Sequence, residues 1–126
     1  MPESSQEVKR LYIVMDVDNT IWSPHTQGPR PGIELLLRSL HVIADINLWS
    51  GASRETHSKE VAAMLGLTQY IAAFHKKPPY PMQEEAAFEV LGRRPDLQVD
   101  DDIAERVAGW PFMWMKPYWG VVGIDR

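Results

Sequence analysis

Short apolar runs alternate with segments of helical periodicity along this sequence, and that alternation restricts the fold more than any other feature of the chain. Residues 11–15 form the first run, which is partly β-branched, as expected for a buried strand. Within residues 33–40, apolar side chains recur at positions i, i+3, i+4 and i+7, which is one face of a helix. Strands alternating with helices predict an α/β fold: a single Rossmann-like α/β/α domain of three layers with a central parallel sheet and right-handed crossovers.

Further elements are expected in the same alternating order. Residues 21–30 read as a loop, and Pro31 suits the first turn of the first helix. A second strand is expected within residues 42–49, and Ser53 is expected to cap a second helix that ends near Gly66. The later elements expected are a strand in 69–74, a helix over 82–91 stopped by Gly92, a strand ending at Asp100, a short helix in 102–109 and a strand within 111–115.

The length of 126 residues allows one domain with one hydrophobic core. We expect residues 1–10, which are polar and lack the apolar stretch of a secretory signal, to be a flexible lead-in, and residues 11–126 to form the domain. No apolar run is long enough to span a membrane. The absence of cysteine excludes disulfides, cysteine-ligated metal sites and thiol catalysis, and it accords with a cytoplasmic location.

The formal net charge of −4 gives the molecule an acidic overall field. Such a field repels polyanions, so nucleic acid is not an expected partner, and no membrane partner is expected either. A local basic pocket for a single phosphate group remains compatible with this charge.

Polar and charged residues follow each predicted strand. They are Asp16 and Asp18 after the first strand, Ser50 and Gly51 after the second, Lys76 and Lys77 after the third, and Asp100 and Asp101 after the fourth. Ligands of parallel sheets bind beyond the carboxyl ends of the strands, so these groups are expected to meet at one edge. Oxygen ligands without cysteine favour a hard cation, and Mg²⁺ is the usual choice with phosphate substrates.

Each group has an ordinary structural explanation when it is taken alone. Asp16 could be a turn residue, Ser50 a helix cap, the two lysines part of a solvated loop, and the acidic run from Asp100 the start of a helix. The functional interpretation depends on finding all four in this order, each at a strand end.

In that order the four groups resemble the motifs of the phosphotransferases of the haloacid dehalogenase superfamily. Its first motif, four hydrophobic residues and Asp-x-Asp-x-Thr, is similar to YIVMDVDNT, and its second, a Ser or Thr closing the second strand, is similar to NLWSG. The third, a Lys often followed by Pro, matches Lys77-Pro78, and the fourth, an acidic pair, matches LQVDDD. The resemblance covers residues 11–108. DVDNTIW is also similar to the start of the magnesium-dependent phosphatases within this superfamily.

The resemblance implies a Mg²⁺-dependent phosphomonoester hydrolase that acts through an aspartyl-phosphate, on a phosphorylated small molecule or macromolecule. Asp16 would be the nucleophile, and Asp18 the general acid and then the base, with its main-chain carbonyl as a metal ligand. Side chains two residues apart on an extended chain face the same side, which suits carboxylates placed around one cation. Thr20 would steady the loop between them, and Mg²⁺ would cancel the repulsion between Asp16 and phosphate.

The resemblance assigns the remaining groups as well. Ser50 would hydrogen-bond a phosphate oxygen, with Gly51 beside it in the substrate site, and Lys77 would neutralise charge on the transferring group. Asp100 would complete the metal site together with Asp16 and Asp18, and Asp101 is the second candidate.

Two assignments stay open, because Lys76 could replace Lys77 and the acidic run is ambiguous by one position. Trp22 and Trp49 lie beside proposed site residues, and either could line the pocket of the leaving group or pack beneath it. The four histidines have no spacing typical of metal ligands and are expected at the surface or in loops.

Members of this superfamily often carry a cap domain, inserted after the first motif or between the second and third. Here both intervals are too short for a domain, so we expect a member without a cap and with an open site. Residues 109–120 hold five aromatic side chains. Core packing or a subunit interface is the favoured interpretation of this tail, and a stacking surface at the mouth of the site is the other.

Two other interpretations account for part of the same pattern. A response-regulator receiver uses similar groups, but its acidic pair comes first, its phosphorylated Asp in mid-chain and its Lys last, which is not the order found here. A non-catalytic binding or assembly module that uses the aromatic tail is the alternative function, and the complete set of motif residues argues against it.

Overall fold

A computed structural model of the chain describes residues 9–120; most of the expected lead-in and the last six residues lie outside the described part. The elements follow one another in the alternating order that the sequence predicts. They are β1 Leu11–Asp16, β2 Trp22–Ser23, β3 Gly28–Pro29, α1 Ile33–Leu40, β4 Ala44–Ser50, α2 His57–Met64, the 3-10 turn η2 Thr68–Tyr70, β5 Ala73–Lys76, α3 Glu84–Leu91, β6 Leu97–Asp100, the 3-10 turn η3 Ile103–Glu105 and β7 Phe112–Trp114.

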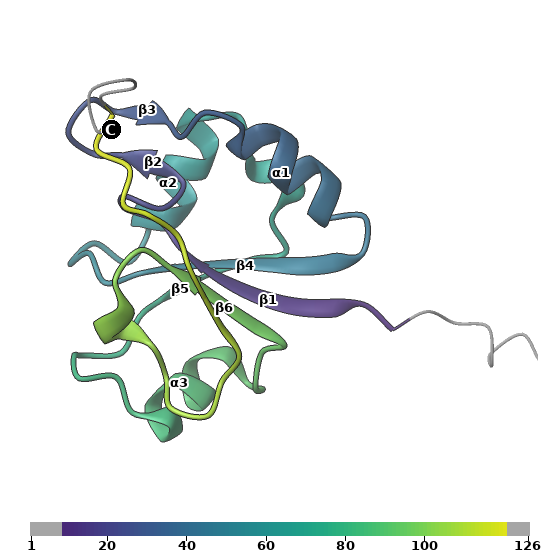
Figure 1. Cartoon of the computed structure of the whole chain (residues 1–126), viewed down its shortest axis with the longest axis vertical. Helices are drawn as coiled ribbons and strands as arrows, with labels where there is room; N and C mark the ends of the chain where they lie inside the picture. The colour runs from purple at the N-terminus through teal and green to yellow at the C-terminus, as the bar shows by residue number, and fades with distance from the viewer. Residues whose placement is uncertain (1–8, 121–126) are drawn as a thin grey trace, which may run out of the picture.

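The central sheet has five parallel strands in the order β5-β4-β1-β6-β7 (Figure 1). The chain builds outward from β1 through β4 to β5, and then returns to the other side of β1 for β6 and β7. The strand order therefore reverses between β1 and β6, which is where such folds open a crevice for ligands. The predicted single α/β domain with a parallel sheet is confirmed, and no cap domain interrupts residues 9–120.

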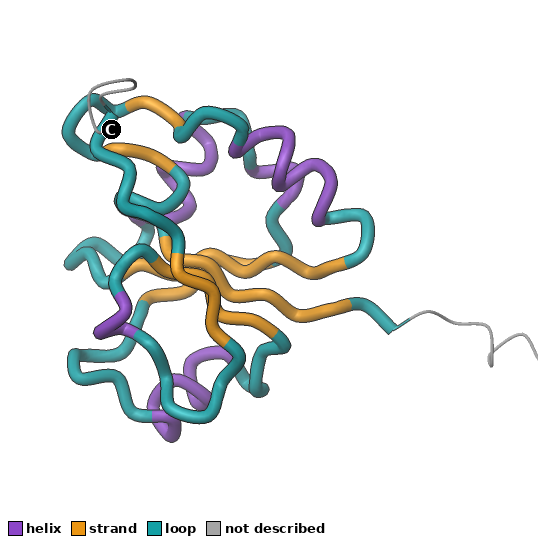
Figure 2. Tube along the Cα trace, in the orientation of Figure 1, coloured by secondary structure: helices purple, strands orange, loops and turns teal. Residues whose placement is uncertain are grey.

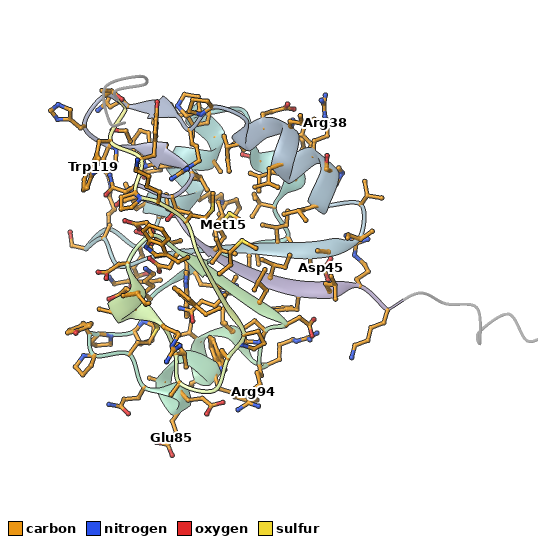
Figure 3. The ribbon with its side chains drawn as sticks, in the orientation of Figure 1. Met15, Arg38, Asp45, Glu85, Arg94 and Trp119 are labelled. Atoms are coloured by element: carbon orange, nitrogen blue, oxygen red, sulfur yellow. The ribbon has the colours of Figure 1, made fainter. Side chains whose placement is uncertain are left out.

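Helices cover both faces of the sheet, as the predicted three layers require (Figures 1 and 2). α1 and α2 lie on one face and α3 on the other. Alternate residues of β1 enter opposite cores, with Ile13 and Met15 packing on the α1–α2 side and Val14 on the α3 side. Met15 points into the middle of the molecule, whereas Arg38 and Glu85 lie on the outer faces of their helices (Figure 3).

The helix starts differ from the sequence prediction. Pro31 lies in a turn, and α1 begins at Ile33, because Gly32 takes a left-handed conformation (φ 84°) that no helix residue adopts. α2 begins at His57 after Thr56, so Ser53 is not its cap.

Three segments also differ between prediction and structure. The expected loop 21–30 contains the hairpin β2–β3, the strand expected in 69–74 begins at Ala73 after a 3-10 turn, and the helix expected in 102–109 is a single turn, η3. Asp102 caps that turn by accepting a hydrogen bond from the Ala104 amide, and Arg106 is already extended, which stops it. The stop of α3 at Gly92, in a left-handed conformation, is confirmed.

The aromatic tail divides between core and surface. Trp110 is buried and stacks on Trp49, with ring centroids 6.2 Å apart. Met113, Trp114 and Trp119 are about half exposed. Core packing is therefore confirmed for Trp110, and a subunit interface through the rest stays a prediction. Within residues 9–120, no helix has the length and apolar character needed to cross a membrane.

Candidate functional site

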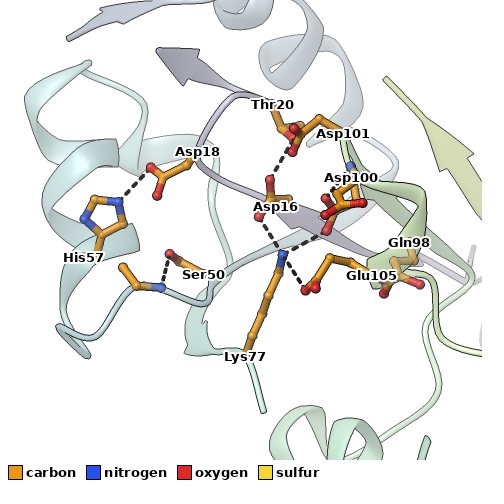
Figure 4. Close-up of polar contacts among 12 residues, drawn as sticks. Asp16, Asp18, Thr20, Ser50, His57, Lys77, Gln98, Asp100, Asp101 and Glu105 are labelled. Atoms are coloured by element: carbon orange, nitrogen blue, oxygen red, sulfur yellow. Dashed lines mark hydrogen bonds and ion pairs between the residues drawn. The ribbon is translucent and has the colours of Figure 1, made fainter. Parts of the chain in front are cut away.

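Four neighbouring strands bring their final residues to one edge of the sheet (Figure 4). Asp16 ends β1, Ser50 ends β4 and Asp100 ends β6, while Lys77 directly follows β5. All four are buried. Because β1 and β6 are neighbouring strands that flank the point where the strand order reverses, Asp16 and Asp100 lie at the place where such folds bind ligands.

A tight turn follows β1 and fixes both aspartates of the first motif. The Val17 carbonyl accepts hydrogen bonds from the amides of Thr20 and Ile21. Asn19, which lies inside this turn, has a positive φ of 65°. The chain therefore folds back, and the Thr20 hydroxyl lies 2.9 Å from Asp16 Oδ2. The turn thus brings together the side chains of Asp16 and Thr20, which a straight strand would keep apart.

Lys77 is the central cation of the site. Its ammonium nitrogen lies 2.7 Å from Asp16 Oδ1, 2.9 Å from Asp100 Oδ2 and 3.4 Å from Glu105 Oε1. Burial alone would lower the pKa of Lys77, but the charges of Asp16 and Asp100 outweigh it and raise the pKa above its ordinary value. Lys77 is therefore cationic throughout the physiological range.

The structure separates the two lysines that the sequence left as alternatives. Lys76 Nζ is exposed and donates to the Ala52 carbonyl at 2.7 Å, outside the carboxylate group. Lys77 is the lysine that joins the carboxylates, as the motif match favoured.

Three aspartates crowd together around this lysine. One oxygen each from Asp16, Asp100 and Asp101 lies within 4.8 Å of the others. Burial, with the charge of Asp16, raises the pKa of Asp100 to about 6, and burial with a hydrogen bond to Asp16 raises that of Asp101 to about 7. Such crowding favours uptake of a proton or of a cation, and carboxylate oxygens suit a hard divalent cation. Both candidates of the acidic run thus belong to the cluster.

Ser50 ends β4, and Gly51 follows it beside Lys77. Ser50 Oγ accepts a hydrogen bond from the Ala52 amide at 3.0 Å, which leaves the hydroxyl hydrogen available to another acceptor. Gly51 and Lys77 line a pocket of about 420 Å³, whose other walls include Tyr80 and Glu105. The lining of this pocket includes Lys77 but neither Asp16 nor Asp100.

Asp18 does not belong to the carboxylate cluster. Its side chain turns away from Lys77 and accepts a hydrogen bond at Oδ1 from His57 Nε2 at 2.8 Å (Figure 4). The same oxygen accepts a hydrogen bond from Trp22 Nε1, also at 2.8 Å. The expectation that both side chains of the first motif face the same way fails for a local reason, because β1 ends at Asp16 and the chain turns at once. The acid/base role of Asp18 and its carbonyl as a metal ligand remain predictions.

Trp22 and Trp49 pack rather than project into open space. Trp22 is 4% exposed and holds Asp18, and it also lines a groove of about 410 Å³ together with His57 and Met64. Trp49 is fully buried on the α3 side of the sheet. Trp22 thus contacts a proposed site residue, Asp18, through a side-chain hydrogen bond.

The sequence prediction missed two residues of the site, His57 and Glu105. His57 was expected at the surface or in a loop, yet its imidazole contacts Asp18. The first residue of the helix after β4 lies at the same sheet edge as the strand ends, and this topological signal could have identified it. Glu105 follows the acidic run by a few positions and reaches Lys77 because η3 turns the chain back.

No family model matches the chain, and no curated protein matches it in sequence.

Proposed function

We propose that this protein is a Mg²⁺-dependent phosphomonoester hydrolase that acts through an aspartyl-phosphate on Asp16. The observation that carries the proposal is the double contact of the buried Lys77 ammonium group, with Asp16 at 2.7 Å and with Asp100 at 2.9 Å. A carboxylate that attacks a phosphate dianion meets strong repulsion, and a cation held against it offsets that repulsion. The pocket beside Lys77 offers room for a phosphate ester.

The carboxylate cluster fits the metal that this chemistry needs. Asp16, Asp100 and Asp101 offer three oxygens in close proximity, and oxygen-only donors suit Mg²⁺, although not Mg²⁺ alone. Burial first, and then the neighbouring Asp16, raises the pKa values of Asp100 and Asp101, and a bound cation would favour their ionised forms. When bound, Mg²⁺ would supply positive charge between Asp16 and the phosphate.

The reaction proceeds in two balanced steps. Asp16 attacks phosphorus through a carboxylate oxygen, and the bond from phosphorus to the leaving oxygen breaks while Asp18 gives that oxygen its proton. Asp18 then takes a proton from water as the water oxygen attacks phosphorus, and the bond from phosphorus to the Asp16 oxygen breaks. This step releases inorganic phosphate and leaves Asp16 as a carboxylate and Asp18 protonated. Lys77 and the Ser50 hydroxyl bind the oxygens of the transferring group.

The substrate is a phosphorylated small molecule or a phosphate on a macromolecule. No cap domain lies within residues 9–120, so the site is open on the side of the pocket. An open site suits a phosphate carried by a large substrate, or closure by a neighbouring subunit.

Hydrolysis of 4-nitrophenyl phosphate tests the proposal. We expect Mg²⁺-dependent release of nitrophenol by the wild type and a loss of at least about a hundredfold in Asp16→Asn, because the nucleophile is gone. Asp45→Asn is the matched control, since Asp45 is a half-exposed carboxylate that pairs with Arg10 away from the site. Equal background rates for wild type and Asp16→Asn, with Mg²⁺ present, would contradict the proposal for small substrates.

One observation favours the alternative of a non-catalytic binding module. Met113, Trp114 and Trp119 leave large apolar surfaces exposed, and such side chains are typical anchors of protein contacts. A module of this kind would bind its partner equally well with Asp16 or Asn at position 16, but would lose it on Trp114→Ala and Trp119→Ala. The opposite dependence would exclude it.

A further inference from the structure

One oxygen of Asp18 receives two hydrogen bonds from different elements of the fold. Trp22 Nε1, from β2, and His57 Nε2, from the start of α2, both lie 2.8 Å from Asp18 Oδ1. The two rings lie next to each other, with centroids 6.3 Å apart. The side chain of His57 is 20% exposed and that of Asp18 is 34% exposed, so the contact is partly shielded from water.

The chemistry of the three groups fixes where the hydrogens are. An indole nitrogen donates only, and an ionised carboxylate accepts only. His57 Nε2 therefore carries a hydrogen, and Asp18 Oδ1 is occupied by two donors. A proton that Asp18 carries as a general acid must then sit on Oδ2.

We infer that His57 is a positioning residue that, together with Trp22, makes Oδ2 the atom of Asp18 that gives and takes the proton. A single donor would leave the carboxylate free to rotate about its Cβ–Cγ bond, whereas two donors from separate elements hold it in one orientation. His57 does not touch the substrate and acts through Asp18. The inference rests on the proposed function and adds to it a residue outside its motifs.

The position of His57 in the fold suits this role. It is the first residue of α2, which packs against β4 and β5, so a rigid element carries the imidazole. Asp18 lies in the tight turn that follows β1, where an isolated bridge pairs it with Trp22. The turn fixes the main chain of Asp18, and α2 adds a donor that orients its side chain.

A purely structural role would give the same contact, because it also ties the β2–β3 hairpin to α2. The two roles differ in how rates depend on the leaving group. A misplaced acid slows the departure of a poor leaving group such as an alkoxide, but hardly affects 4-nitrophenolate, which leaves without a proton. A loosened fold slows all substrates alike.

The experiment compares the phosphorylation step for 4-nitrophenyl phosphate, phenyl phosphate and an alkyl phosphate in single turnovers with Mg²⁺. The variants are His57→Phe, which keeps a ring but has no donor, and His57→Gln, whose amide nitrogen can take the place of Nε2. His41→Phe is the control, since His41 contacts Tyr70 away from the site. We expect His57→Phe to cleave the alkyl phosphate about tenfold slower with an unchanged nitrophenyl rate, and His57→Gln to recover most of the loss.

Two results would overturn the inference while leaving the proposed function intact: an equal loss for all three substrates, or no loss for any. If the wild type hydrolyses none of them, the proposed function fails and the role of His57 fails with it. A readout independent of activity is the ¹⁵N spectrum of the imidazole. Protonation at Nε2 is expected, and a ring with hydrogen on Nδ1 alone would refute the inference, because its Nε2 could not donate to Asp18.

Discussion

Replacing Lys77 by Met tests the electrostatic core of the site, because it removes the ammonium group and keeps most of the apolar stem. The lost cation lies 2.7 Å from Asp16 and 2.9 Å from Asp100, in a side chain that is 6% exposed. Removing one partner of a buried ion pair costs about 3–5 kcal/mol, because the remaining charge stays buried without compensation. That is a large part of the roughly 5–15 kcal/mol that stabilises a typical domain.

The cost of Lys77→Met depends on pH, and its sign follows from the neighbouring carboxyl groups. The pKa is raised to about 6 for Asp100 and to about 7 for Asp101, first of all by burial. Above pH 7 both are ionised in the folded wild type, so the cation offsets most negative charge there and its loss has the largest effect. Near pH 5 both carry protons and repel Asp16 less, so the destabilisation is clearly smaller.

Urea unfolding of the metal-free protein at pH 8 and pH 5 measures both values. Lys76→Met is the control: the neighbouring lysine is exposed and donates only to a main-chain carbonyl, so we expect a change within about 0.5 kcal/mol. If Lys77→Met does not fold at pH 8, the double variant with Asp100→Asn should recover part of the loss, because it removes one of the unpaired charges. Equal unfolding midpoints for Lys77→Met and Lys76→Met at pH 8 would refute the reasoning.

Three further predictions concern the carboxylate cluster. The folded-state pKa values of Asp100 and Asp101 lie above the ordinary 3.8, so their contribution to stability is complete below about pH 4 and is lost as the pH rises through 6 and 7. Urea unfolding at a series of pH values should show this decrease in the free energy of unfolding, and Asp101→Asn should make the decrease smaller. Mg²⁺ at ten times its dissociation constant should stabilise the protein by about 1.4 kcal/mol in thermal unfolding at pH 8. The same Mg²⁺ concentration should stabilise it less at pH 5, where protons compete for the carboxylates, and Asp100→Asn should abolish the stabilisation. Thr20→Val should cost about 1–2 kcal/mol in urea unfolding, since it deletes the hydroxyl that donates to Asp16, whereas an unchanged midpoint would show that this bond is not formed in solution.

The sequence predicted which polar residues lie at the edge of the sheet, and the reason is physical. Strands of a parallel sheet are buried on both faces, so they appear as short apolar runs whose ends are easy to find. Once the ends are known, topology alone brings their next residues together, and Asp16, Ser50, Lys77 and Asp100 meet as predicted. Helix boundaries were less certain, because they depend on backbone conformations such as the left-handed Gly32.

The sequence could not predict which way side chains turn after a strand ends. The direction of Asp18 depends on the tight turn at Asn19 and on two donors that come from elsewhere in the chain. His57 stands 39 residues after Asp18, and no periodic pattern relates the two positions. Contacts of this kind appear only when α2 is packed on the sheet.

At the sheet edge, the length of the charged side chains matches their distance from the point where the strand order reverses. Asp16 and Asp100 are short side chains on the two strands that flank that point. Lys77 follows β5, which lies two strands, or about 10 Å, from β1, so a short side chain there could not reach the cluster. Its stem must pass the end of β4, where Gly51 stands: a Cβ at that position would already touch the Lys77 Cδ at 3.8 Å. The length of the Lys77 side chain, and the small residue that its stem passes, thus suit a strand order in which the cation has to cross the end of β4 to reach the two acids.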